Sequence, residues 1–83
     1  MANMIVEILT LESILLSTEA KSVVVPGTSG RFEMLNNHAP IISTLQEGTI
    51  KVIDNNDDEK LIEIAGGSLE MSNNKITILA DAT

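Results

Sequence analysis

The 83 residues suffice for one domain with a thin core, and the absence of cysteine excludes disulfides and thiolate zinc sites. Twelve acidic residues against five basic ones give a net charge of −7, and one side chain is aromatic, which argues against binding to nucleic acid or anionic lipid. The apolar runs are shorter than a membrane span, and the N-terminus lacks the pattern of a signal peptide.

Most of the chain alternates apolar and polar residues with a period of two, as half-buried strands require. Met4-Ile5-Val6-Glu7-Ile8 shows the pattern near the N-terminus, and Lys75-Ile76-Thr77-Ile78-Leu79 shows it near the C-terminus. Turn-forming pairs such as Pro26-Gly27, Asn36-Asn37 and Asn73-Asn74 separate the alternating segments. In chain order, the predicted strands span residues 4–10, 13–18, 21–25, 31–35, 41–45, 49–53, 60–65, 67–72 and 75–79.

Short strands separated by frequent turns predict an all-β fold, a sandwich or barrel of about nine or ten mostly antiparallel strands. No segment keeps a period of 3.6 residues long enough for a substantial helix. The chain contains no linker, repeat or low-complexity tract, so we expect residues 1–83 to form a single domain.

The alternation also predicts which side chains face the core. The residues expected to point inward are Val6, Ile8, Val23, Val25, Phe32, Met34, Ile50, Val52, Ile62, Ile64, Leu69, Met71, Ile76 and Ile78. Five aliphatic residues then point outward, namely Ile5, Leu9, Val24, Leu61 and Leu79. They could form a contiguous binding patch or a second small cluster that closure of the sandwich buries, and the sequence leaves both alternatives open.

Few residues could carry chemistry. His38 is the only histidine, and neither a nucleophile elbow nor a phosphate-binding loop is present. The acidic run 54–59 matches the first ligands of a calcium loop, but Glu59 and Ala65 stand where that loop needs glycine and glutamate. We therefore expect a solvated hairpin tip there, with weak calcium binding as the alternative. The sequence predicts no catalytic residue, cofactor or metal ligand.

His38 itself lies in a loop between predicted strands. Its ring could pack against Pro40 or cap a backbone carbonyl, or it could be a recognition residue on a binding loop.

Five segments in order carry a resemblance to a known family. Segment 25–30 contains a Gly-x-x-Gly turn, segment 36–42 a His-Ala-Pro followed by two aliphatic residues, and segment 45–50 a glycine that opens a strand. Segment 65–71 contains a Gly-Gly-x-Leu-Glu run, and segment 76–81 ends in Leu-Ala-Asp. In this order and spacing, the chain resembles the N-terminal domain of the epsilon subunit of F-type ATP synthases.

The resemblance implies a flattened β-sandwich with no active site or cofactor of its own. Such a domain sits at the foot of the central stalk, packs on the gamma subunit and touches the ring of the membrane sector. The implied function is that of a non-catalytic rotor subunit, which couples rotation of the ring to gamma and so to ATP synthesis. It would be peripheral to the cytoplasmic face of a bacterial inner membrane or the organellar equivalent, held there only by partner subunits.

The resemblance also assigns partners to individual positions. Residues expected to face gamma are Thr10, Ile42, Ser43 and Thr49. Residues expected to face the ring are Arg31, Phe32, Glu33, Asn36, Asn37 and His38. Arg31 stands where relatives often have an acidic residue, so the charge pairing with the ring is expected to differ. Asn36-Asn37 replaces the commoner Pro-Gly, which is a mild change because both pairs form turns.

The residues after Asp81 are Ala82 and Thr83. Many relatives continue into a helical hairpin that can block ATP hydrolysis, so we expect this chain to lack that hairpin, its inhibition and its nucleotide binding. The rival hypothesis, from another class, is a free-standing β-sandwich adaptor that binds a protein or peptide along a sheet edge.

Overall fold

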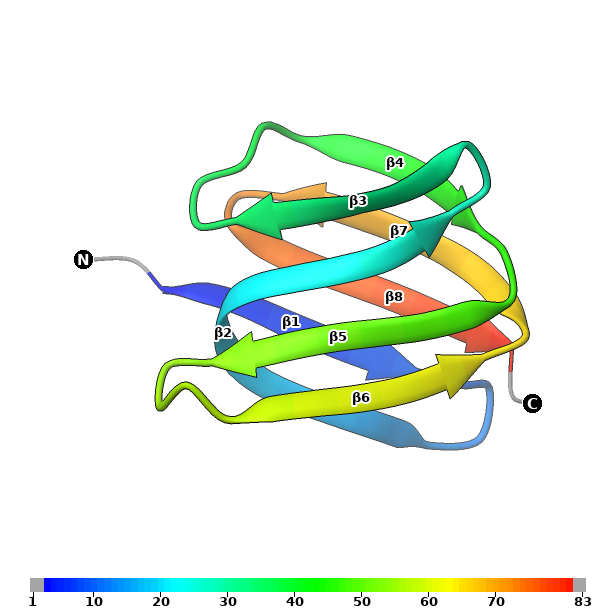
Figure 1. Cartoon of the computed structure of the whole chain (residues 1–83), viewed down its shortest axis with the longest axis horizontal. Coiled ribbons are helices and arrows are strands. Elements are labelled where there is room, and N and C mark those ends of the chain that lie inside the picture. The colour runs from blue at the N-terminus through cyan, green and yellow to red at the C-terminus, as the bar shows by residue number, and fades with distance from the viewer. Residues whose placement is uncertain (1–2, 82–83) are drawn as a thin grey trace.

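The computed structural model describes residues 3–81, which fold as an all-β domain of eight strands (Figure 1). None of these residues belongs to a helix with the length and hydrophobicity that crossing a membrane requires. In chain order the strands are β1 (Met4–Leu9), β2 (Ile14–Gly27), β3 (Gly30–Leu35), β4 (Ile41–Leu45), β5 (Gly48–Asp54), β6 (Glu59–Ile64), β7 (Gly66–Ser72) and β8 (Lys75–Asp81).

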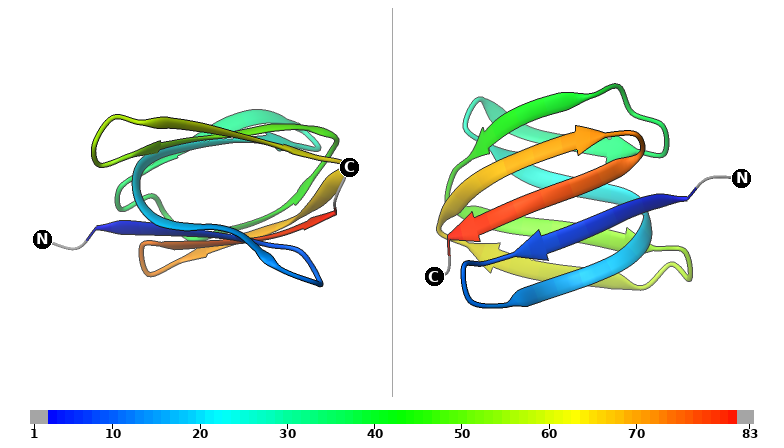
Figure 2. Two further views of the ribbon diagram at one scale, coloured as in Figure 1. Left: turned by 90° about the horizontal axis from the view of Figure 1, so that it is seen from below. Right: turned by 180° about the vertical axis from the view of Figure 1, so that it is seen from behind.

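The strands form one hydrogen-bonded sheet that folds over into two facing layers (Figure 2). One layer contains β3, the second half of β2, β5 and β6, and the other contains β4, β7, β8, β1 and the first half of β2. Neighbouring strands are antiparallel except for the parallel pair β1–β8. The predicted all-β sandwich is therefore confirmed.

The strand count differs from the prediction because β2 is a single strand of 14 residues. Its first half pairs with β1 as far as Ala20, which lies opposite Met4. The register then shifts between Ala20 and Ser22, and the second half pairs with β5. A strand that changes layers at a bulge is a known way to build the corner of a sandwich. Residues 19–20, which separated the two predicted strands, lie in the segment that makes this passage.

The core lies between the two layers and is almost entirely aliphatic. Twelve of the fourteen residues expected to point inward are buried, while Phe32 and Ile62 are half-buried and pack against the core. Phe32 lies over Gly27, because a β-carbon added to that glycine would stand 2.8 Å from the phenyl ring. Alternation along the strands thus identified the core correctly. The buried apolar residues that it did not name are Met4, Ala20, Leu45 and Ala80.

The five outward-facing aliphatics do not form one patch. Leu9 lies opposite Leu79 on β8 and opposite Ile14 on β2, so these three make a row on the outer face of one layer. Val24 and Leu61 lie on the other layer, on either side of Lys51. Neither alternative left open by the sequence holds in full, since Leu9 and Val24 are half-buried and the others are exposed.

The acidic run forms the tip of the β5–β6 hairpin, as expected. The Asp54 carboxylate is largely buried, and its Oδ1 accepts backbone N–H groups from Asn56 at 2.9 Å and Asp58 at 3.0 Å. Asp57 has a positive φ of 66° and forms an exposed ion pair with Lys21. Asp54 therefore serves to build the turn, in the way that Asp side chains commonly do.

Candidate interaction surface

The residues expected to face gamma do not share one face of the sandwich. Ile42 projects outward from β4 and is 81% exposed, whereas Ser43 is the next residue and points toward the opposite face. Thr10 lies in the β1–β2 turn, where its Oγ1 accepts the N–H of Ser13 at 3.1 Å. Thr49 is half-buried on β5, in the other layer. Thr10 and Ile42 therefore belong to one layer and Thr49 to the other.

The residues expected to face the ring follow the length of the edge strand β3. Arg31 is exposed opposite Pro26, next to the turn that joins β2 to β3. Glu33 is exposed in the middle of the strand, and its Oε2 accepts a hydrogen bond of 2.6 Å from the Ser22 hydroxyl. Asn36, Asn37 and His38 follow the other end of the strand. The structure therefore distributes these residues along an edge, except that Phe32 points inward and packs against the core. Their contact with the ring stays a prediction.

His38 stabilises its own loop. Its backbone N–H donates to the Leu35 carbonyl at 3.0 Å, which closes a four-residue turn. Asn37, the third residue of that turn, has a φ of 65°, in the left-handed region that glycine and asparagine tolerate best. The His38 ring places Nδ1 2.7 Å from the Ala39 carbonyl oxygen, so Nδ1 carries the proton and donates it. The expectation that His38 caps a backbone carbonyl is confirmed.

A second turn holds this loop from the side. Asn73 and Asn74 connect β7 to β8 with φ angles of 52° and 60°, as a two-residue hairpin turn requires. The Asn74 side chain accepts the Asn37 N–H at Oδ1, at 2.7 Å, and donates from Nδ2 to Asn36 Oδ1, also at 2.7 Å. We call these three residues, Asn36, Asn37 and Asn74, the amide clamp. It links the β3–β4 loop to a hairpin 37 residues away in sequence.

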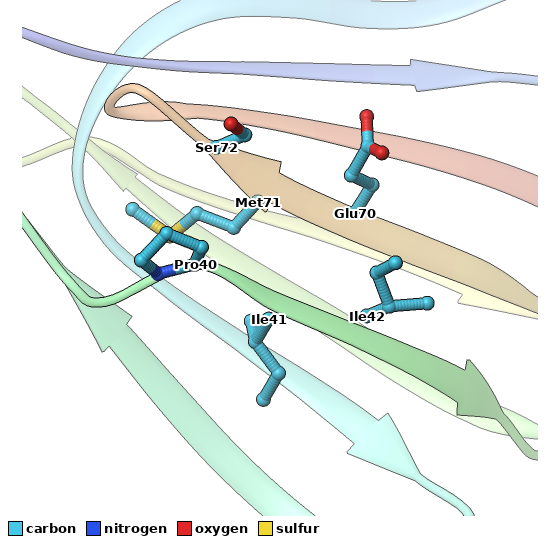
Figure 3. Close-up of a pocket in the computed structure, with 6 residues that line it drawn as sticks. All are labelled: Pro40, Ile41, Ile42, Glu70, Met71 and Ser72. Atoms are coloured by element: carbon cyan, nitrogen blue, oxygen red, sulfur yellow. The ribbon is translucent and has the colours of Figure 1, made fainter.

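A shallow hollow lies beside the clamp, between β4 and β7 (Figure 3). Ile42 on β4 and Glu70 on β7 are directly opposite each other in the strand register, and both side chains project from the outer face of the sheet. Pro40 lies at one end of the hollow beside Met71, and the Ile41 side chain points to the opposite side of β4 from Ile42. The lining residues are Pro40, Ile41, Ile42, Glu70, Met71 and Ser72.

The chemistry of this surface suits binding. An exposed aliphatic side chain beside a carboxylate can pack on an apolar residue of a partner and attract a neighbouring basic group. Within residues 3–81, no three His, Asp or Glu side chains converge as metal ligands would.

Comparison with known proteins identifies the family of the chain. A family model described as "ATP synthase, Delta/Epsilon chain, beta-sandwich domain" matches residues 3–83. The chain belongs to this family. The epsilon chain of Bordetella avium (strain 197N) is 40% identical to it over 81 residues, covering 98% of this chain and 57% of that protein. The epsilon chain of Desulfitobacterium hafniense (strain DCB-2) is 47% identical over 70 residues, covering 84% of this chain and 52% of that protein.

Solved structures show the same fold. A chain of the Euglena gracilis mitochondrial ATP synthase, solved as OSCP, F1 and c-ring, superposes with a TM-score of 0.89 at 16% identity, over 96% of this chain and 51% of that one. A chain of the Tetrahymena thermophila mitochondrial ATP synthase, solved as central stalk and c-ring, superposes with a TM-score of 0.79 at 14% identity. The match covers 96% of this chain and 64% of that one. The chain thus spans about half the length of the relatives that it matches. These findings favour an ATP synthase subunit over a free-standing adaptor.

The sequence alone does not indicate two parts of this surface. In the sequence, Glu70 is only one residue of a family motif, and its position opposite Ile42 depends on the pairing of β4 with β7. Asn74 is recognisable there only as a turn residue. Its amide reaches the β3–β4 loop because β7 and β8 bring the turn there, which one sequence does not reveal.

Proposed function

We propose that this chain is a non-catalytic subunit of the central stalk of an F-type ATP synthase, where it couples rotation of the membrane ring to the gamma subunit. The observation that carries the proposal is the family match over residues 3–83, together with the same fold in chains of two mitochondrial ATP synthases, one of them solved as central stalk and c-ring. As a peripheral subunit it would reach the membrane through its partners, at the cytoplasmic face of a bacterial inner membrane or the organellar equivalent.

In this proposal, gamma docks on the outer face of the layer that contains β4, β7, β8 and β1. This face carries Ile42 at one side and the row of Leu9, Ile14 and Leu79 at the other. Exposed aliphatic side chains in such numbers are typical of a protein that works in a complex. Thr10, at the end of β1, borders the same layer and would contact gamma at its rim.

The ring then meets the edge formed by β3 and residues 36–38 of the loop after it, while Pro40 at the end of that loop borders the face that gamma covers. Arg31 and Glu33 present opposite charges along this edge, and Asn36, Asn37 and His38 present polar groups at its end. Polar and charged contacts at the edge of an interface contribute more to orientation than to affinity. Ring contact is therefore expected to depend on which of these charges meets an opposite charge.

The test is co-purification of the untagged chain with its cognate gamma subunit, scored by light scattering and titration calorimetry. Ile42→Asp places a charge where an aliphatic side chain is 81% exposed, so folding is unaffected but docking should weaken by about tenfold or more. Leu61→Asp is the matched control, because Leu61 is 63% exposed on the opposite layer.

A one-to-one complex that Ile42→Asp weakens and Leu61→Asp does not would support both the subunit and its gamma face. No complex with the unmodified chain would refute the stalk proposal. Equal weakening by both substitutions would still support a complex with gamma, but it would refute the assignment of gamma to the outer face that carries Ile42.

A further inference from the structure

The amide clamp joins the two chain segments that form the walls of the hollow. The β3–β4 loop leads directly into Pro40 and Ile42, and the β7–β8 turn follows directly on Glu70 and Ser72. Two side-chain hydrogen bonds of 2.7 Å connect these segments through Asn74. The loop that ends the hollow is therefore held by a residue outside it.

Asn74 is well placed to act as this anchor. Its side chain is half-buried, and its backbone carbonyl accepts the Ile5 N–H at 3.1 Å, which ties the turn to β1 as well. By contrast, Asn36 and Asn37 are exposed. A fixed turn with its amide aimed at an exposed loop restricts the conformations that the loop can adopt before a partner arrives.

We infer that Asn74 is a positioning residue, which holds the β3–β4 loop and its Pro40 in the conformation that the gamma subunit binds. This inference rests on the proposed function. Its physical basis is pre-organisation, because a loop already ordered in the free subunit loses less conformational entropy on binding. Without the clamp, the loop would become ordered only when gamma binds, and the entropy lost in that step would weaken the affinity for gamma.

The turn itself offers a matched pair of substitutions. Asn74→Gly removes both side-chain bonds, yet glycine readily adopts the φ of 60° at this position. Asn73→Gly makes the same change at the neighbouring residue, whose φ is 52° and which is not part of the clamp. Both variants should keep the hairpin, and cooperative urea unfolding with the slope of the unmodified chain would show that the fold is intact.

Two measurements then test the inference. In the free chain, amide hydrogen exchange at Asn37 should become about threefold to tenfold faster in Asn74→Gly, since Asn74 Oδ1 no longer accepts that N–H. Calorimetry with gamma should show an affinity about threefold to tenfold weaker for Asn74→Gly. Asn73→Gly should leave both quantities at the values of the unmodified chain.

The inference is overturned if Asn74→Gly leaves Asn37 exchange unchanged. It is also overturned if exchange accelerates while affinity for gamma stays the same, or if Asn73→Gly weakens binding equally. Failure of the unmodified chain to bind gamma would instead refute the proposed function, and the positioning role would fall with it. A loss confined to Asn74→Gly supports the inference.

Discussion

Replacing Gly67 by alanine tests how closely β7 and β8 approach each other where β7 begins. Gly67 lies opposite Ala80 in the register and has a φ of +150°, a conformation that residues with a side chain rarely adopt. A β-carbon built at this position would stand 3.1 Å from the Ala80 α-carbon and well inside van der Waals contact with the Leu79 carbonyl oxygen. Both obstacles are backbone atoms, so no rotation of a side chain can relieve the clash.

The expected cost follows from these two effects. A non-glycine residue in a sparsely populated backbone region costs about 1–3 kcal/mol. Overpacking against a neighbour that cannot move adds about 1–3 kcal/mol, for a total of about 2–6 kcal/mol. A core of this size supplies only about 3–5 kcal/mol of stability. Gly67→Ala should therefore remove most of the stability of the isolated domain at 25 °C.

Gly30→Ala is the control, because Gly30 also has a positive φ, +129°, but an added β-carbon would meet no atom within 4 Å. Gly30→Ala should lower the free energy of unfolding only by the cost of the unfavourable backbone conformation, about 1–3 kcal/mol. Urea unfolding followed by far-ultraviolet circular dichroism measures both free energies. If Gly67→Ala and Gly30→Ala cost the same, the close approach of the two strands is not what requires glycine at position 67.

The same urea assay checks two further predictions. Asp54→Ala should lower the free energy of unfolding by about 1–3 kcal/mol, because it removes the acceptor for two backbone N–H groups of the hairpin tip. Asp57→Asn removes only the exposed ion pair with Lys21 and should cost less than about 1 kcal/mol. Equal losses of stability would contradict the role given to Asp54. Met34→Ala should cost about 2–5 kcal/mol at a fully buried site, and Leu11→Ala, at a residue 94% exposed, should stay within about 0.5 kcal/mol of the unmodified chain. A large loss at Leu11 would show that this side chain is buried in solution.

The local features of the fold could be predicted because they depend on neighbouring residues. Alternation in segments such as Lys75-Ile76-Thr77-Ile78-Leu79 determines which side chains are buried, since successive residues of a strand face opposite sides. Turn chemistry was readable for the same reason, and Asn73-Asn74 does form the β7–β8 turn. The passage of β2 between the layers was not predicted, because four of the five residues from Ser17 to Lys21 are polar and yet none forms a turn.

Features that depend on pairing between strands distant in the sequence could not be predicted. The parallel pair β1–β8 joins the first and last strands, and no short-range pattern indicates it. The same holds for the candidate surface, where Ile42 was predicted through a resemblance but its neighbour Glu70 required the β4–β7 register. Ile42 and Ser43, both expected to face gamma, point to opposite sides of β4, and their contact with gamma stays a prediction.

The continuous strand β2 has a mechanical consequence. Its first half is hydrogen-bonded in one layer and its second half in the other, so the layers are joined by an unbroken backbone as well as by loops. Sliding one layer across the other would require stretching that backbone or breaking its ladder on one side. A twisting force applied to either outer face is therefore passed to the opposite face by main-chain bonds, and the domain turns as a stiff block.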